Sequence, residues 1–165
     1  VVLGGTGGGA QYDLSVAADL AQKIKSAAAS FSSVAVTPSR RTPDYLLDAV
    51  RDALTGRDAF VWDGAGNNPY IDILAKAGAL IVTADSHNMM SEALATGAGV
   101  YAYRPPKLAP KLAWFLNELE RKGAVRPFNG EAEIFSTDPI NATNEIGNDI
   151  RRRLATIGCK ENTHR

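Results

Sequence analysis

A strand-like run, a polar turn and a helical segment follow one another in residues 79–100, ALIVTADSHNMMSEALATGAGV. The apolar run Ala79–Val82 is typical of a strand buried in a parallel sheet. Asp85 or Ser86 can cap the helix that follows, because either side chain can accept a free backbone N–H of the first helical turn. Gly97 can end this helix in a left-handed conformation, and another apolar run follows it. The pattern therefore predicts one strand–turn–helix–strand unit.

The polar residues of this unit gather where the predicted strand ends, which is the edge at which ligands bind in open α/β sheets. The helix N-terminus at Ser86 offers unpaired N–H groups and a partial positive charge, which suit a phosphate. Asn88 and Glu92 are four residues apart and share a helix face just beyond it. Because a carboxylate can accept hydrogen bonds from a diol such as ribose, the unit predicts a site for a phosphate and a ribose.

The composition is that of one globular domain. The chain has 165 residues, of which 45% are hydrophobic, and Lys plus Arg equal Asp plus Glu at 18 each. We therefore predict one domain over residues 1–158 with a tail at 159–165, no nucleic-acid partner and no membrane span. The single cysteine, Cys159, cannot form an internal disulfide and indicates a reducing compartment such as the cytoplasm. Neither His87 nor His164 lies in a cluster of ligands, so no metal is predicted.

A glycine-rich turn, Gly4–Gly9, follows the strand-like Val1–Leu3 at the start of the chain. Since the chain opens on a strand and without a methionine, we expect an N-terminal half to be missing. The glycines allow close approach of a phosphate and leave N–H groups free to bind it. The spacing fits neither the dinucleotide fingerprint nor a Walker loop, so a merely flexible loop is the alternative. The candidate phosphate contacts of this turn are Gly5, Thr6 and Gly7.

Two prolines, Pro38 and Pro43, bracket a rigid loop after the predicted strand at 33–37. Between them lie two guanidinium groups flanked by hydroxyls, and arginine pairs bidentately with phosphate. The loop is therefore a candidate anion clamp, with solvated surface arginines as the alternative. Its residues are Ser39, Arg40, Arg41 and Thr42, of which the last is also expected to cap the next helix with Pro43 at its first position.

The loop after the predicted strand at 58–62 is the candidate site for a nucleobase. Trp62 and Asp63 lie at the strand end, where an aromatic ring and polar groups can receive a base; core packing is the alternative for Trp62. Asn68 is expected to cap a short helix that begins at Tyr70, with a proline at its first position. For Asn68 a role as a cap alone is the alternative to a functional role.

Strand and helix patterns alternate five times along the chain. This alternation predicts an α/β fold, a Rossmann-like doubly wound parallel sheet of strand order 3-2-1-4-5. We further expect a small edge strand at 132–135 after a connector at 126–128, and a last helix at 141–157. The first helix, at 12–30, is expected to bury Leu14, Ala17, Ala18, Ala21, Ile24 and Ala28. The helix at 111–121 is expected to bury Leu112, Phe115, Leu116 and Leu119.

Three motifs, at residues 36–43, at 62–64 with 68–70, and at 82–93, resemble the family of the plant mitochondrial fission factor called elongated mitochondria. Bacterial relatives in that family are labelled predicted nucleoside-diphosphate-sugar epimerases. More distantly, the turns at 4–6 and 83–92 are similar to the nucleotide-sugar lobe of MurG-type glycosyltransferases. The resemblance implies the C-terminal, nucleotide-binding lobe of a glycosyltransferase-B-type fold, whose missing N-terminal lobe would carry the acceptor side.

The resemblance also implies roles for single residues. Glu92 would bind the ribose, and Trp62 and Asp63 would frame the base. The sugar side would be formed by Asn68, Tyr70 and His87, and the diphosphate would be lined by Thr6, Gly7, Asp85 and Ser86. The turn at 83–86 is poorer in glycine than in those transferases, and Asp85 would repel a diphosphate unless it caps the helix or points away.

Three functions are compatible with these patterns. The first is glycosyl transfer from a nucleotide sugar, with no other cofactor and with a general base from the missing lobe; the catalytic residue is therefore unknown. The second is a nucleoside-diphosphate-sugar epimerase that uses Asp63 and Asp85. The third is a non-enzymatic interaction factor, with peripheral membrane association of the full-length protein at the cytosolic face of mitochondria.

Overall fold

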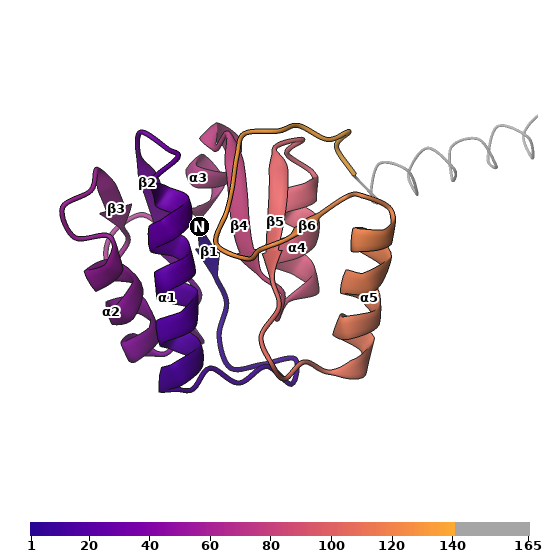
Figure 1. Cartoon of the computed structure of the whole chain (residues 1–165), viewed down its shortest axis with the longest axis horizontal. Helices are drawn as coiled ribbons and strands as arrows, with labels where there is room; N and C mark the ends of the chain where they lie inside the picture. Colours follow the sequence, from indigo (N-terminus) through magenta and orange to yellow (C-terminus); the bar gives the residue numbers. More distant parts are fainter. Residues whose placement is uncertain (141–165) are drawn as a thin grey trace, which may run out of the picture.

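The computed structural model describes residues 1–140, which form a six-stranded, all-parallel sheet flanked by helices (Figure 1). The strand order is β3-β2-β1-β4-β5-β6, so the predicted order is confirmed, and one further strand extends the sheet beyond β5. The strands are β1 (Val2–Leu3), β2 (Val34–Pro38), β3 (Ala59–Val61), β4 (Ala79–Thr83), β5 (Gly99–Tyr103) and β6 (Arg126–Pro127). The helices are α1 (Leu14–Ala28), α2 (Asp44–Ala53), α3 (Tyr70–Lys76), α4 (His87–Leu94) and α5 (Pro110–Arg121).

The two faces of the sheet carry separate hydrophobic cores. On one face, α1 and α2 pack against the strands through buried residues such as Leu20 and Val50. On the other, α3, α4 and α5 contribute buried residues such as Met90 and Leu116. Ile81 of β4 belongs to the first core and its two sequence neighbours to the second, because side chains alternate across a strand. Burial on both faces explains why the central strands are nearly continuous apolar runs.

The buried face of α1 differs from the predicted one at two positions. The helix begins at Leu14, whose side chain is 73% exposed, and Ala18 is exposed as well. Their places in the core are taken by Val16 and Leu20, four residues apart and both buried. The helix starts here because Asp13 caps it, its carboxylate accepting the Val16 N–H at 2.9 Å. The remaining predicted stripe, Ala17, Ala21, Ile24 and Ala28, is buried as expected.

The segment after α5 corrects two further predictions. β6 lies at 126–127, where a connector was predicted, and residues 132–135 are not a strand. They form an extended segment anchored by Phe135, whose carbonyl accepts the Gly99 N–H at 2.7 Å and whose ring packs edge-on to Tyr101. Phe115, predicted to be buried, is only half-buried. The predicted helix at 141–157 and the tail at 159–165 lie outside the described residues. Among residues 1–140, no helix is long and apolar enough to cross a membrane.

Candidate functional site at the carboxyl edge of the sheet

The loops that follow β1, β2 and β4 meet at the carboxyl edge of the sheet and are hydrogen-bonded to one another. The Gly5 N–H donates to Asp85 Oδ2 at 3.0 Å, which joins the first loop to the fourth. The Thr6 N–H donates to the Arg41 carbonyl at 3.2 Å, which joins it to the second. A Cβ built on Gly5 would lie 1.8 Å from that same carbonyl oxygen, so only glycine fits between the loops. Three of the predicted site segments are thereby brought together.

Asp85 is turned into the protein rather than toward solvent. Asp85 is only 2% exposed, and its Oδ1 accepts a hydrogen bond from the Tyr12 hydroxyl at 2.9 Å. A Cβ on Gly4 would lie 2.1 Å from Oδ2, so the glycine turn closes over the carboxylate. Burial, and then the Asp85 carboxylate, raise the pKa of Tyr12, which keeps the phenol protonated as a donor. The cap of α4 is supplied by Ser86, whose Oγ accepts the Met89 N–H at 3.5 Å.

The glycine turn is a packed element of the fold. Gly8 and Gly9 have positive φ angles of 56° and 80°, which residues with a side chain rarely adopt. The Gly8 carbonyl accepts the Ala109 N–H at 2.8 Å, so the connection between β5 and α5 also reaches the turn. The N–H groups of Gly4, Gly5 and Thr6 are used by protein acceptors. Gly7 pairs with Ala10 in an isolated antiparallel bridge, whereas the N–H groups of Gly8 and Gly9 have no acceptor within residues 1–140.

The arginine loop packs against the glycine turn. A Cβ built on Gly7 would lie 2.2 Å from Arg41 Nη1, so this guanidinium group lies against the turn. Arg40 and Arg41 are exposed, and neither forms an ion pair with another described residue. Thr42 does not cap α2, because its hydroxyl contacts the Gly4 carbonyl at 2.6 Å and accepts the Ser39 N–H at 2.9 Å. The predicted cap was wrong because the Thr42 hydroxyl bonds to the glycine turn and to Ser39 of its own loop instead of to α2.

Trp62 and Asp63 bond within their own loop. The half-buried indole of Trp62 donates to the Ala65 carbonyl at 2.8 Å, and Asp63 Oδ1 accepts the Ala65 N–H at 2.9 Å. Asn68 Oδ1 accepts the Tyr70 N–H at 2.9 Å, so it supports the start of α3, although Pro69 holds the cap position. Among the described residues, no hydrogen bond joins Trp62 or Asp63 to the glycine turn.

The residues predicted to contact the ribose and the sugar take part in two separate contacts. Tyr70 donates its hydroxyl proton to Glu92 Oε2 at 2.5 Å, which links α3 to α4. The His87 ring lies 4.7 Å from the Phe115 ring, centroid to centroid, so it packs on α5. Asn88 is exposed on the same helix. Burial, and then Glu92, raise the pKa of Tyr70, which keeps its hydroxyl a hydrogen-bond donor.

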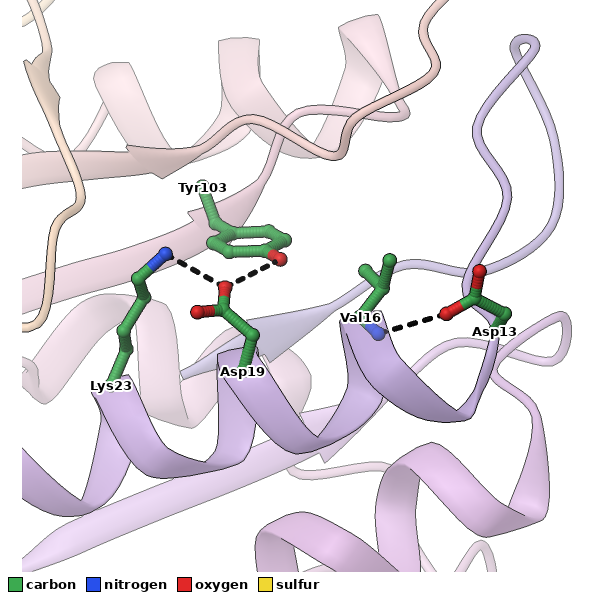
Figure 2. A network of polar contacts seen from close by, with 5 residues as sticks. All are labelled: Asp13, Val16, Asp19, Lys23 and Tyr103. Carbon is green, nitrogen blue, oxygen red and sulfur yellow. Dashed lines mark hydrogen bonds and ion pairs between the residues drawn. The ribbon is translucent and has the colours of Figure 1, made fainter.

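A network on α1 holds this helix, and hence the turn before it, against β5 (Figure 2). Asp19 accepts hydrogen bonds from Tyr103 at 3.2 Å and from Lys23 at 2.7 Å. At the start of the helix, hydrogen bonds from Ser15 and Val16 lower the pKa of Asp13. The capping carboxylate is therefore favoured in its charged form, which suits a helix N-terminus.

Tyr12 is a residue of this edge that was not predicted as a site residue. Tyr12 was assigned to the first helix, and only its contact with Asp85, 73 positions away, reveals its role. Lys107 donates to Gln11 Oε1 at 2.8 Å beside the glycine turn.

An apolar hollow of about 460 Å³ lies at the opposite edge of the sheet, beside Phe31, Ile73 and Ile134, and no candidate site residue lines it. No group of three His, Cys, Asp or Glu that could hold a metal occurs in the described part of the chain.

Comparisons with known proteins connect this chain to one family. The model of a family described as Mitochondrial fission ELM1 matches residues 1–154. The chain is 34% identical over 152 residues to the mitochondrial fission protein ELM1 of Arabidopsis thaliana, covering 90% of this chain and 36% of that protein. It is 33% identical over 124 residues to an uncharacterised protein of Rickettsia prowazekii (strain Madrid E), covering 70% and 35%. The chain thus spans about a third of these curated relatives. No solved structure matches it significantly.

Proposed function

This chain belongs to the mitochondrial fission ELM1 family, and we propose that it binds a nucleotide sugar at the carboxyl edge of its sheet. Membership of the family confirms the resemblance seen in the three sequence motifs. The observation that carries the proposal is the junction of three loops, in which the exposed Arg41 guanidinium lies against a glycine turn with free N–H groups. Guanidinium and backbone N–H groups converging on one point are a general means of binding phosphate.

The phosphates are proposed to bind between the glycine turn and the arginine loop. The N–H groups of Gly8 and Gly9 and the guanidinium groups of Arg40 and Arg41 would hold them, with the hydroxyls of Thr6 and Ser39 beside them. The N-terminus of α4 at Ser86 adds further N–H groups. Because the Asp85 carboxylate is buried and hydrogen-bonded, it presents no exposed negative charge to a phosphate. The repulsion expected from the sequence is thereby avoided.

The nucleoside is proposed to extend along α4. Glu92 and Asn88 would face the ribose, Trp62 and Asp63 the base, and Asn68 and His87 the sugar side. For glycosyl transfer, the cationic edge would stabilise the leaving diphosphate as negative charge develops on it. The general base would come from another part of the longer protein. We favour transfer over epimerisation because Asp85, one of the two carboxylates available for the latter, is only 2% exposed.

A second candidate function follows from the description of the family itself. A non-enzymatic fission factor would retain the fold as a scaffold and act through partners at the cytosolic face of mitochondria. Fold alone does not separate the two candidates, since one fold hosts many functions. Ligand binding does separate them, because a non-enzymatic fission factor requires no nucleotide.

The test is a titration of the purified chain with UDP, GDP, ADP, TDP and their sugar conjugates, followed by NMR. We expect shifts at residues 5–9, 39–42 and 83–92, and a loss of affinity of about tenfold in Arg41→Ala, the contribution of one charge-assisted hydrogen bond. Arg57→Ala is the matched control, because Arg57 is an exposed arginine just before β3, at the opposite edge. Absence of binding at millimolar concentration contradicts the proposed function and favours the fission-factor scaffold.

A further inference from the structure

We infer that Tyr70 is a positioning residue for Glu92, and that this pair makes the site select ribonucleotides over 2′-deoxyribonucleotides. The inference rests on the proposed function, since it concerns the ribose subsite of the proposed nucleotide site. It assigns Tyr70 a role different from the direct sugar contact predicted from the sequence.

The contact joins two helices that are far apart in the sequence. Tyr70 is the first residue of α3, and its hydroxyl lies 2.5 Å from Glu92 Oε2 on α4, 22 positions away. Two features hold the phenol in place. Asn68 accepts the backbone N–H of Tyr70 at 2.9 Å, and the ring is partly buried against the core formed by α4 and α5. A fixed donor therefore meets a carboxylate that would otherwise be free to rotate.

The second carboxylate oxygen of Glu92 remains available. Within residues 1–140, the Glu92 side chain has no hydrogen-bond partner other than Tyr70, and the residue is exposed. An exposed glutamate loses conformational entropy when it is ordered, so an unfixed carboxylate binds a ligand less well. Because Tyr70 already orders one oxygen, the other is pre-organised to accept from a hydroxyl. A neutral phenol also leaves the carboxylate its negative charge, which strengthens such a bond.

The distance along α4 suits a ribose attached to a bound phosphate. Glu92 lies five residues after His87, the first residue of the helix. At 1.5 Å per residue this is about 8 Å along the axis from the free N–H groups. Asn88 lies one turn before Glu92 on the same face. A ligand that contacts both the N–H groups at the start of α4 and the Glu92 carboxylate is a 5′-phosphorylated nucleoside with a free ribose diol. A 2′-deoxynucleotide lacks this diol.

The experiment compares affinities for UDP, GDP and ADP with those for their 2′-deoxy counterparts. We expect the native chain to favour the ribonucleotide about tenfold, the factor of one hydrogen bond to a charged group. Tyr70→Phe should lower this ratio about fivefold, and Glu92→Gln should lower it at least as much. Tyr103→Phe is the matched control, because it also removes a phenol–carboxylate hydrogen bond, that to Asp19, on the face of the sheet opposite α4.

Each outcome has one meaning. If the native chain binds none of the six nucleotides, the proposed function fails and the inference fails with it. If it binds them but Tyr70→Phe keeps the native ratio of ribonucleotide to deoxynucleotide affinity, the inference alone is overturned. A loss of thermal stability in Tyr70→Phe without a change in that ratio is the result expected of a purely structural pin between α3 and α4, and it also overturns the inference.

Discussion

Asp85 and Gly5, 80 positions apart, are joined by a 3.0 Å hydrogen bond from the Gly5 N–H to the Asp85 carboxylate. The bond connects the turn after β1 with the turn after β4, the two central strands of the sheet. The same carboxylate accepts a hydrogen bond from the Tyr12 hydroxyl, so one buried side chain holds two segments of the edge. The candidate site is therefore assembled around an internal acceptor.

Asp85→Asn should destabilise the fold by about 2–3 kcal/mol. The amide has one acceptor oxygen in place of two, so either the Gly5 N–H or the Tyr12 hydroxyl is left facing an N–H₂ group in a buried place. Urea denaturation measures the loss. Asp48→Asn, an exposed aspartate on α2 paired with Arg51, is the control and should change stability by less than about 0.5 kcal/mol. Equal effects in the two variants would contradict the role assigned to Asp85.

Gly5→Ala should cost about 1–3 kcal/mol, because the added methyl meets backbone that cannot move away cheaply. A Cβ there would lie 1.8 Å from the Arg41 carbonyl oxygen. Gly78→Ala serves as the comparison, since its nearest contact is the flexible end of Ile134 at 3.3 Å. Thermal unfolding of both variants checks the prediction. An unchanged midpoint in Gly5→Ala would mean that the two loops are not packed as described.

Leu20→Ala and Leu14→Ala test the corrected face of α1 with one and the same substitution. Leu20 is fully buried, so truncation should cost about 2–5 kcal/mol through lost burial and a cavity. Leu14 is 73% exposed, so its truncation should cost less than about 0.5 kcal/mol. Denaturant midpoints of the two variants decide the matter. A larger effect at Leu14 would restore the face predicted from the sequence.

Stability should fall as the pH rises above about 10, the ordinary pKa of tyrosine. Burial raises the pKa of Tyr12, Tyr70 and Tyr103, and a neighbouring carboxylate raises each further. A folded-state pKa above the unfolded value means that the unfolded chain releases its proton first, so the contribution is complete below the unfolded pKa and is lost at higher pH. Absorbance titration of the native chain should therefore lag behind that of the urea-unfolded chain. Tyr12→Phe should reduce the part of the absorbance change that is delayed in the native chain. Coincident native and unfolded titration curves would refute the raised pKa values.

The residues from 79 to 100 determined much of the fold locally. An apolar run, a polar cap and a glycine are near neighbours in sequence, and their preferences depend on adjacent backbone only. The strand order then followed from the right-handed crossover rule, since each connection contains a helix. Ser86 as the cap of α4 and Gly97 with a φ of +77° were predictable for the same reason.

Only the tertiary structure decided which groups of the candidate site are free. Thr42 has the pattern of a cap, but its hydroxyl contacts the Gly4 carbonyl, 38 positions away. Asp85 has the pattern of a ligand residue, but Gly5 and Tyr12 occupy its oxygens. The partners of a polar side chain depend on segments that folding brings together, and sequence spacing carries no record of them. The sequence therefore located the edge of the sheet, whereas long-range packing determined which of its donors and acceptors remain for a ligand.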